Sequence, residues 1–94
     1  ESKKRVMPEQ AKALRRFFPE LDDTPATGRT LAEVLSEMET RYPGLCSYLT
    51  DEQGSLRRHV NIFIDGTMIQ DRATLSDSFS GNSEIYIIQA LSGG

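Results

Sequence analysis

The stretch TLAEVLSEMETRYPG at residues 30–44 decides the fold of this sequence. Thr30 and Glu33 have the spacing of a capping box, in which each side chain bonds a free backbone N–H of the first helical turn. The apolar side chains that follow recur at the spacing of one buried helix face, with glutamates on the opposite face. Pro43 and Gly44 end the helix after about three turns. The side chains expected to face the core are Leu31, Val34, Leu35 and Met38.

Two strands follow the helix, because two β-branched and aromatic runs are each bounded by turn residues. The first run is VNIFI at residues 60–64, and the Asp65-Gly66 pair after it favours a tight hairpin into a short strand at residues 67–70. The second run is IYII at residues 85–88, after a Ser-Gly-Asn turn. Side chains alternate between the two faces of a strand, so one set must face the helix. The expected inward set is Val60, Ile62, Ile64, Ile85 and Ile87.

The N-terminal part of the chain gives weaker signals. A strand is expected at residues 4–7. Residues 9–18 contain Ala, Lys, Gln and Arg between two prolines, and they are interpreted as a loop or a helical turn. A short strand follows near residues 21–27, and Pro25 restricts it to a sheet edge because proline has no backbone N–H to donate.

The order of these elements predicts the fold class. It is strand, strand, helix, strand, short strand and strand, with one more irregular or helical turn at residues 44–49. One helix between two pairs of strands cannot build a doubly wound sheet, but it can cover one face of a mixed sheet. We therefore expect an α+β protein with a mixed four- to five-stranded sheet covered by one main helix. Residues 1–90 are expected to form a single domain, and residues 91–94 a flexible C-terminal tail.

Length and composition exclude several classes of protein. The chain has 94 residues, of which 37% are hydrophobic and 27% charged, as is typical of one small globular domain. Its apolar runs are too short to span a bilayer, and its basic N-terminal segment lacks the interleaved aromatic side chains of a nucleic-acid interface. The single Cys46 can form no internal disulfide, which suits a reducing compartment. We expect a cytoplasmic protein that binds neither membrane nor nucleic acid.

Few residues could support catalysis by the chain itself. His59 is the one histidine, and no cysteine or serine can be assigned as its nucleophile. No neighbouring group would lower the pKa of Cys46, so this residue is expected to pack or to lie at the surface. The acidic pairs at residues 22–23 and 51–52 lie among turn residues, and no cluster has metal-ligand spacing. The sequence predicts neither an enzyme active site nor a bound metal or cofactor.

The end of the chain carries the most distinctive chemistry. ALSGG at residues 90–94 follows directly on the last expected strand and ends in two glycines. Such a tail can enter a narrow channel in another protein's active site, because it carries no bulky side chains there. Its α-carboxylate must first be activated, for example as an acyl-adenylate, which requires a partner that uses ATP. The alternative is a frayed terminus without a chemical role. Gly94 is the candidate reactive residue, Gly93 is the residue that permits access, and Leu91 and Ser92 are candidate partner contacts.

Residues 26–94 resemble the ThiS/MoaD group of ubiquitin-like sulfur carriers. The resemblance rests on TGRTLAEVLSEMETRYPGL, LTDEQGSLRRHVNIFIDG and SEIYIIQALSGG, which occur in the order of that group. It implies a β-grasp fold and a protein cosubstrate that is not an enzyme. Gly94 would be adenylated by an ATP-dependent activating enzyme and converted to a thiocarboxylate. The sulfur would come from a sulfurtransferase or another donor, and a downstream synthase would accept it.

Within this group, the segment DEQGSLRRHVNIFIDG most resembles the carriers for cysteine and for sulfur-containing natural products. The alternatives are a thiamine thiazole carrier, the small subunit of molybdopterin synthase, a ubiquitin-like modifier conjugated through Gly94, and an interaction domain with an incidental Gly-Gly. The chain departs from the group in its longer, helix-prone residues 8–18 and at Gln89 and Ser92, where proline and alanine are more frequent.

A second face of the sheet offers a candidate surface for the activating enzyme. If Ile62 and Ile87 face the helix, alternation places Phe63, Tyr86 and Ile88 on the opposite face, beside the root of the tail. A contiguous apolar patch of this kind usually marks a binding site. The alternative is that the N-terminal segment, with its phenylalanines at positions 17 and 18, folds over the patch and buries it.

Overall fold

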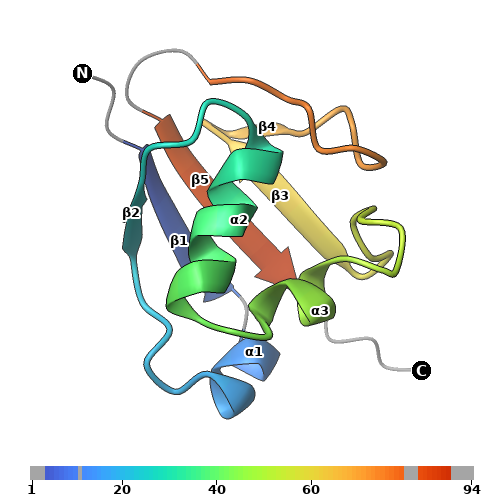
Figure 1. Ribbon diagram of the computed structural model, residues 1–94. Coiled ribbons are helices and arrows are strands. Elements are labelled where there is room, and N and C mark those ends of the chain that lie inside the picture. The colour runs from blue at the N-terminus through green and yellow to red at the C-terminus, as the bar shows by residue number, and fades with distance from the viewer. Residues whose placement is uncertain (1–3, 11, 80–82, 90–94) are drawn as a thin grey trace.

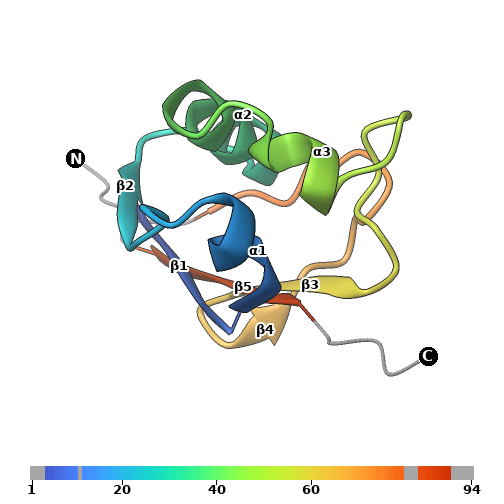
Figure 2. The ribbon, with the colours of Figure 1, turned by 90° about the horizontal axis from the view of Figure 1, so that it is seen from below.

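The computed structural model describes residues 4–10, 12–79 and 83–89, and within them one mixed sheet is packed against helices (Figures 1 and 2). The sheet has the strand order β2-β1-β5-β3-β4. The main helix α2 and the short helix α3 lie over one face, and α1 lies at the end of the sheet beside α3. The strands are β1 (Lys4–Gln10), β2 (Thr24–Ala26), β3 (Val60–Ile64), β4 (Thr67–Met68) and β5 (Ser83–Gln89), and the helices are α1 (Lys12–Phe17), α2 (Leu31–Arg41) and α3 (Leu45–Leu49).

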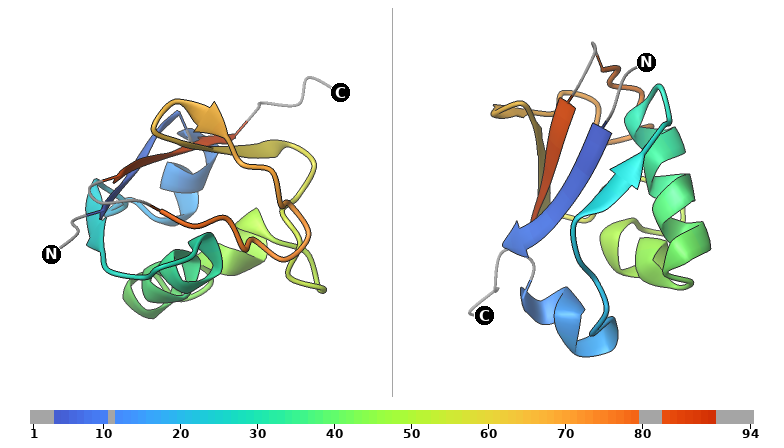
Figure 3. Two further views of the ribbon diagram at one scale, coloured as in Figure 1. Left: turned by 90° about the horizontal axis from the view of Figure 1, so that it is seen from above. Right: turned by 90° about the vertical axis from the view of Figure 1, so that its left-hand side faces the viewer.

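The expected α+β class and β-grasp layout are confirmed. β1 and β5, from the two ends of the chain, pair as parallel strands in the centre of the sheet, as the right-hand view of Figure 3 shows. β1 and β2 are antiparallel, and β5 pairs antiparallel with β3. The connection through α2 places the helix across the sheet, so the helix and the central strands enclose the core.

The main helix begins at its expected cap. Thr30 is the N-cap, and its hydroxyl accepts a hydrogen bond from the backbone N–H of Glu33 at 3.3 Å. In a capping box, the Glu33 carboxylate would accept a hydrogen bond from the backbone N–H of Thr30. Here it accepts instead from the backbone N–H of Arg29, at 3.0 Å. Thr30 itself forms a β-bridge with Ser78. The helix ends at Arg41, just before the Pro-Gly pair.

The predicted core is confirmed. The four helix side chains and four of the five predicted strand side chains are buried, and Ile64 is half-buried against the same cluster. The expected turn at residues 44–49 is the helix α3, and Leu45 and Leu49 are both fully buried there. The sequence periodicities therefore identify the two layers that enclose the core.

The hairpin after β3 forms at the expected dipeptide. Asp65 and Gly66 both have positive φ, at 52° and 87°, as a type I′ turn requires. The following strand β4 has two residues, which is shorter than the expected strand at residues 67–70. The expected turn at residues 80–82 lies outside the described residues.

The predicted end of the first strand needs correction, whereas the helical turn expected after it is confirmed. β1 continues to Gln10 rather than ending at Met7, and α1 then occupies most of the segment interpreted as a loop or a helical turn. Proline has no backbone N–H to donate to a neighbouring strand, so it fits a strand only where pairing is interrupted. At Pro8 this condition is met, since β2 pairs with β1 only up to Val6 and the register with β5 shifts between Met7 and Gln10. The prediction for Pro25 is confirmed, since its strand β2 is an edge strand.

Candidate partner-binding surface

The structure brings the three predicted contact residues together on the sheet face opposite the core. Phe63 and Tyr86 lie directly opposite each other in the β3–β5 ladder, and Ile88 lies opposite Asn61. All three apolar side chains are half-buried, so they are less exposed than the sequence suggested. Their position follows from strand alternation, whereas their role in binding stays a prediction.

Two methionines extend this surface into a row across four strands. Met7 of β1 pairs with Tyr86, and Met68 of β4 pairs with Phe63. Met68 is 46% exposed, whereas Met7 is buried, with 6% of its surface exposed. The sequence reasoning missed both. The two-residue turn at Asp65-Gly66 could have revealed Met68, because it fixes the register that places this residue opposite Phe63. We use the name outer apolar row for the three predicted residues and Met68, with the buried Met7 at one end: Phe63, Tyr86, Ile88, Met68 and Met7.

The alternative in which the two N-terminal phenylalanines cover this patch is wrong. The Phe17 ring stacks on Tyr48 of α3 with 4.8 Å between ring centroids, and Phe18 meets the same ring edge-on at 5.7 Å. Phe18 also packs against the core cluster. Both side chains therefore lie beside α3, and Phe17 remains 58% exposed.

The C-terminal tail begins at a defined point of the sheet. β5 ends at Gln89, which lies opposite Val60, the first residue of β3. Residues 90–94 lie outside the described residues. The four tail predictions, for Leu91, Ser92, Gly93 and Gly94, therefore stay predictions.

The cysteine is not an activated nucleophile. Burial raises the pKa of the Cys46 thiol to about 11, and the charge of the nearby Glu39 carboxylate acts in the same direction. Glu39 accepts backbone hydrogen bonds from Gly44 at 2.7 Å and from Cys46 at 2.9 Å, and these bonds lower the pKa of its carboxyl. The thiol donates to the Leu35 carbonyl at 3.3 Å. This confirms the expectation that nothing near Cys46 depresses its pKa.

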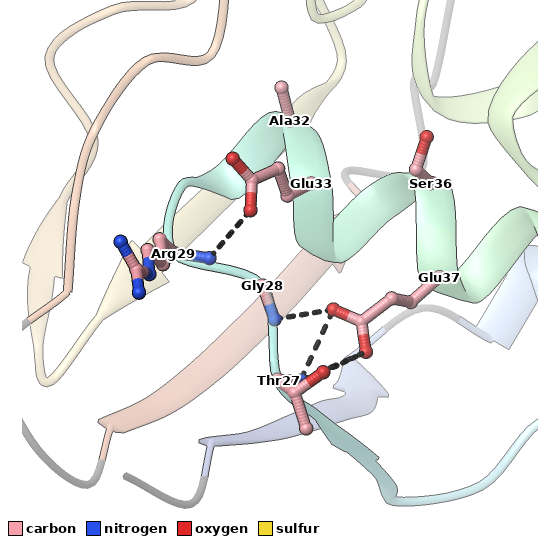
Figure 4. A pocket seen from close by; sticks show the side chains of 7 residues that line it. All are labelled: Thr27, Gly28, Arg29, Ala32, Glu33, Ser36 and Glu37. Carbon is pink, nitrogen blue, oxygen red and sulfur yellow. Dashed lines mark hydrogen bonds between the residues drawn. The ribbon is translucent and has the colours of Figure 1, made fainter.

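The polar side chains that line a hollow beside the start of α2 form hydrogen bonds with the backbone of the preceding loop (Figure 4). The Glu37 carboxylate accepts from the backbone N–H of Thr27 at 2.9 Å and from that of Gly28. A Cβ at Gly28 would lie 2.7 Å from that of Glu33, so the loop approaches the helix too closely for a side chain there. These contacts fix the β2–α2 connection, and the acidic groups drawn in Figure 4 are engaged in backbone bonds.

Two kinds of feature are absent from the described part of the chain. Within residues 4–10, 12–79 and 83–89, no three His, Cys, Asp or Glu side chains are placed to hold a metal ion. None of the helices described there has the length and apolar character needed to cross a bilayer.

The loop after β4 depends on one carboxylate, which leads to a prediction about pH. Asp71 accepts hydrogen bonds from the hydroxyl groups of Ser76 and Thr74 and from the backbone N–H of Thr74, and these bonds hold its pKa well below the usual range. The stabilisation is complete above the ordinary carboxyl pKa of about 3.9 and is lost as the pH falls toward the lower folded-state pKa. We expect the melting temperature to fall between about pH 5 and about pH 2, and less steeply in Asp71→Asn. Thermal melts that fall in parallel for both proteins would contradict this role.

Comparison with known proteins places the chain in a family. Residues 10–94 match the sequence profile of the ThiS family. The chain belongs to the ThiS family. Among curated proteins, this ThiS-family chain is 31% identical over 71 residues to the sulfur carrier protein CysO of Mycobacterium tuberculosis, and the match covers 73% of this chain and 76% of CysO.

Solved structures of similar fold agree with this membership. The ThiS-family chain has a TM-score of 0.77 and 26% identity to the crystal structure of M. tuberculosis CysO, over 94% of this chain and 99% of that one. The Amycolatopsis orientalis BexX/CysO complex contains a chain with a TM-score of 0.79 and 22% identity, over 97% and 99% of the two chains. The small archaeal modifier protein 1 of Methanosarcina acetivorans gives a TM-score of 0.75 and 24% identity, over 99% and 97%. The last two likenesses support the β-grasp fold alone.

Proposed function

We propose that this chain is a sulfur carrier, a protein cosubstrate whose Gly94 carboxylate is activated and converted to a thiocarboxylate. The observation that supports this most strongly is the terminal Gly-Gly on a ThiS-family chain that is similar to a sulfur carrier protein over most of its length. We assign catalysis to partner enzymes, as the resemblance to protein cosubstrates implies, and the raised pKa of about 11 at the buried Cys46 thiol agrees with this.

The proposed chemistry has two steps. A Gly94 carboxylate oxygen attacks the α-phosphorus of ATP, which forms the acyl-adenylate and releases pyrophosphate. A sulfur donor at the oxidation level of sulfide then attacks the acyl carbon, the C–O bond to AMP breaks, and the thiocarboxylate forms with loss of a proton. The partners are an ATP-dependent activating enzyme, a sulfurtransferase or another donor, and a downstream synthase that accepts the sulfur.

The outer apolar row is the proposed docking surface for the activating enzyme. It crosses β5, the strand that leads into the tail, so an enzyme that binds there receives the tail nearby. The 31% identity to the sulfur carrier protein CysO supports sulfur transfer. The resemblance of DEQGSLRRHVNIFIDG to the carriers for cysteine and sulfur-containing natural products favours such a metabolite over molybdopterin as the destination of the sulfur. Conjugation to protein lysines through Gly94 would share the activation step and differ in the acceptor.

Intact-mass spectrometry tests the proposed function. The purified chain is incubated with ATP, a sulfide source and its activating enzyme. We expect the mass gain that accompanies replacement of one carboxylate oxygen by sulfur, and no gain without ATP. Covalent adducts with other proteins would instead indicate a modifier, and an unchanged mass under all conditions would contradict the proposal.

Substitutions on the outer face test the docking surface. Phe63→Ser and Ile88→Ser remove half-buried apolar side chains from the face opposite the core. We expect each to weaken binding of the activating enzyme by about tenfold, as for truncation of an interface residue worth more than 1 kcal/mol. Calorimetric titration measures the binding, and thermal melts should show little change.

A matched control exists on the helix side. Phe17→Ser removes an aromatic ring that is 58% exposed and stacked on Tyr48, away from the outer face. Its binding constant should equal that of the wild type. If Phe63→Ser lost stability but kept its affinity, the residue would belong to a second small core and the docking assignment would fail.

A further inference from the structure

A basic hollow lies beside the end of β5. It has a volume of ≈ 690 Å³ and is lined by residues from the loop before β3, from β3 itself, from β4 and from the loop after it. Three guanidinium groups line it against one carboxylate, that of Asp51, which accepts backbone N–H bonds from Gln53 and Ser55. We use the name basic hollow for Arg57, Arg58, His59, Asn61, Met68 and Arg72.

Two of the arginines are held in place by neutral oxygens. Arg72 donates to the Asn61 side-chain oxygen at 2.9 Å and to the backbone carbonyl of Arg57 at 2.6 Å. Arg57 donates through Nε to the Ser47 carbonyl at 3.2 Å. Among the residues that the structure describes, no carboxylate lies within ion-pair distance of either guanidinium. Each guanidinium has five N–H donors, so most donors of both side chains remain available to a ligand.

The third arginine differs from these two. Arg58 is exposed, and no hydrogen bond or ion pair holds its side chain within the described residues. It can therefore be substituted without breaking a contact that supports the fold. The hollow thus combines positioned positive charge at Arg57 and Arg72 with a free positive charge at its rim.

The basic hollow is continuous with the outer apolar row and with the root of the tail. Met68 belongs to both the hollow and the row, and Asn61 lies opposite Ile88. His59 directly precedes Val60, which lies opposite Gln89, the last residue of β5. Figure 1 shows β5 ending beside the beginning of β3. A partner that binds the row beside the end of β5 therefore lies next to the hollow.

We infer that the basic hollow docks an acidic segment of the activating enzyme, whose carboxylates pair with the three guanidinium groups. This inference rests on the proposed function, because it takes the enzyme that receives Gly94 as the partner. Fork-shaped guanidinium groups match carboxylates in bidentate geometry, and surfaces that combine Arg, Tyr and Met are typical of protein interfaces. A nucleic-acid ligand is disfavoured because the whole chain carries a net charge of −3.

Charge reversal at Arg58 tests the inference in the activation reaction. Arg58→Glu should raise the KM of the activating enzyme for this chain about tenfold or more, because like charges then face each other. The kcat and the melting temperature should stay unchanged, and the effect should shrink as added salt screens the charges. The matched control is Arg29→Glu, an exposed arginine in the β2–α2 connection, which makes the same change in net charge. Its KM should stay within about twofold of the wild type. An unchanged KM for Arg58→Glu, or an equal rise for Arg29→Glu, would overturn the inference.

A second measurement separates this inference from the proposed function. The isotopically labelled chain is titrated with a hexaglutamate peptide, and the arginine Nε–H signals are followed by nuclear magnetic resonance. We expect shifts at Arg57, Arg58 and Arg72 that are lost in Arg58→Glu and absent with hexalysine. If the wild type is never thiocarboxylated but these shifts appear, the acidic-segment site stands and the proposed function fails. No shift with hexaglutamate, or a stronger response to inorganic phosphate or to an oligonucleotide of equal charge, would overturn the inference.

Discussion

Removal of Gly94 is expected to abolish thiocarboxylate formation while the fold stays intact. The deletion leaves a carboxylate on Gly93, but it withdraws the reacting group by about 3.5 Å along an extended chain. A displacement of about 1 Å can cost about 100-fold in rate, so we expect the loss to exceed 100-fold. The last strand ends at Gln89, so the melting temperature should match that of the wild type. Intact-mass spectrometry after reaction with ATP and sulfide measures the product.

Two substitutions in the tail sharpen this prediction. Gly93→Ala adds a methyl group and restricts φ next to the reacting residue, and it should also lower the rate. Ser92→Ala changes a predicted partner contact one position further back. Because alanine is more frequent at this position in the group that the chain resembles, its rate should fall much less than that of Gly93→Ala. If the chain without Gly94 still acquired sulfur at the normal rate, the reactive group would lie elsewhere.

Truncation of Ile62 is expected to produce the largest loss of stability. Ile62 is fully buried in the centre of β3, and it lies opposite Ile87 beneath the main helix. Ile62→Ala removes buried surface and leaves a cavity, so the free energy of unfolding should fall by about 2–5 kcal/mol. Denaturant titration measures this loss.

The matched control is Ile88→Ala, the same substitution on the outer face of the neighbouring strand. Ile88 is half-buried and lies opposite Asn61, so its truncation should cost much less stability than that of Ile62. Equal losses for the two variants would contradict the assignment of the inner and outer faces.

The main helix, the strands β3 and β5 and the hairpin between β3 and β4 could be predicted because their sequence signals are local. The Thr30 cap, the helical spacing of apolar residues and the Asp65-Gly66 turn act within a few residues of the backbone that they shape. Strand alternation then assigned Ile62 to the core and Phe63 to the opposite face, as the structure shows. The tail chemistry was a further inference from the terminal glycines, and it remains a proposal.

Only the tertiary structure decided the N-terminal segment and the basic hollow. β1 passes through Pro8 to Gln10 because it pairs in parallel with β5, which lies more than 70 residues away in the sequence, and no local pattern encodes that contact. The basic run at residues 57–59 can be read from the sequence. The contact between this run and Arg72 cannot be predicted from it. Arg72 reaches this run because the chain turns back after β4 and bonds Asn61 and the Arg57 carbonyl. Local chemistry thus determined the elements, whereas long-range pairing determined which charged side chains meet beside the end of β5.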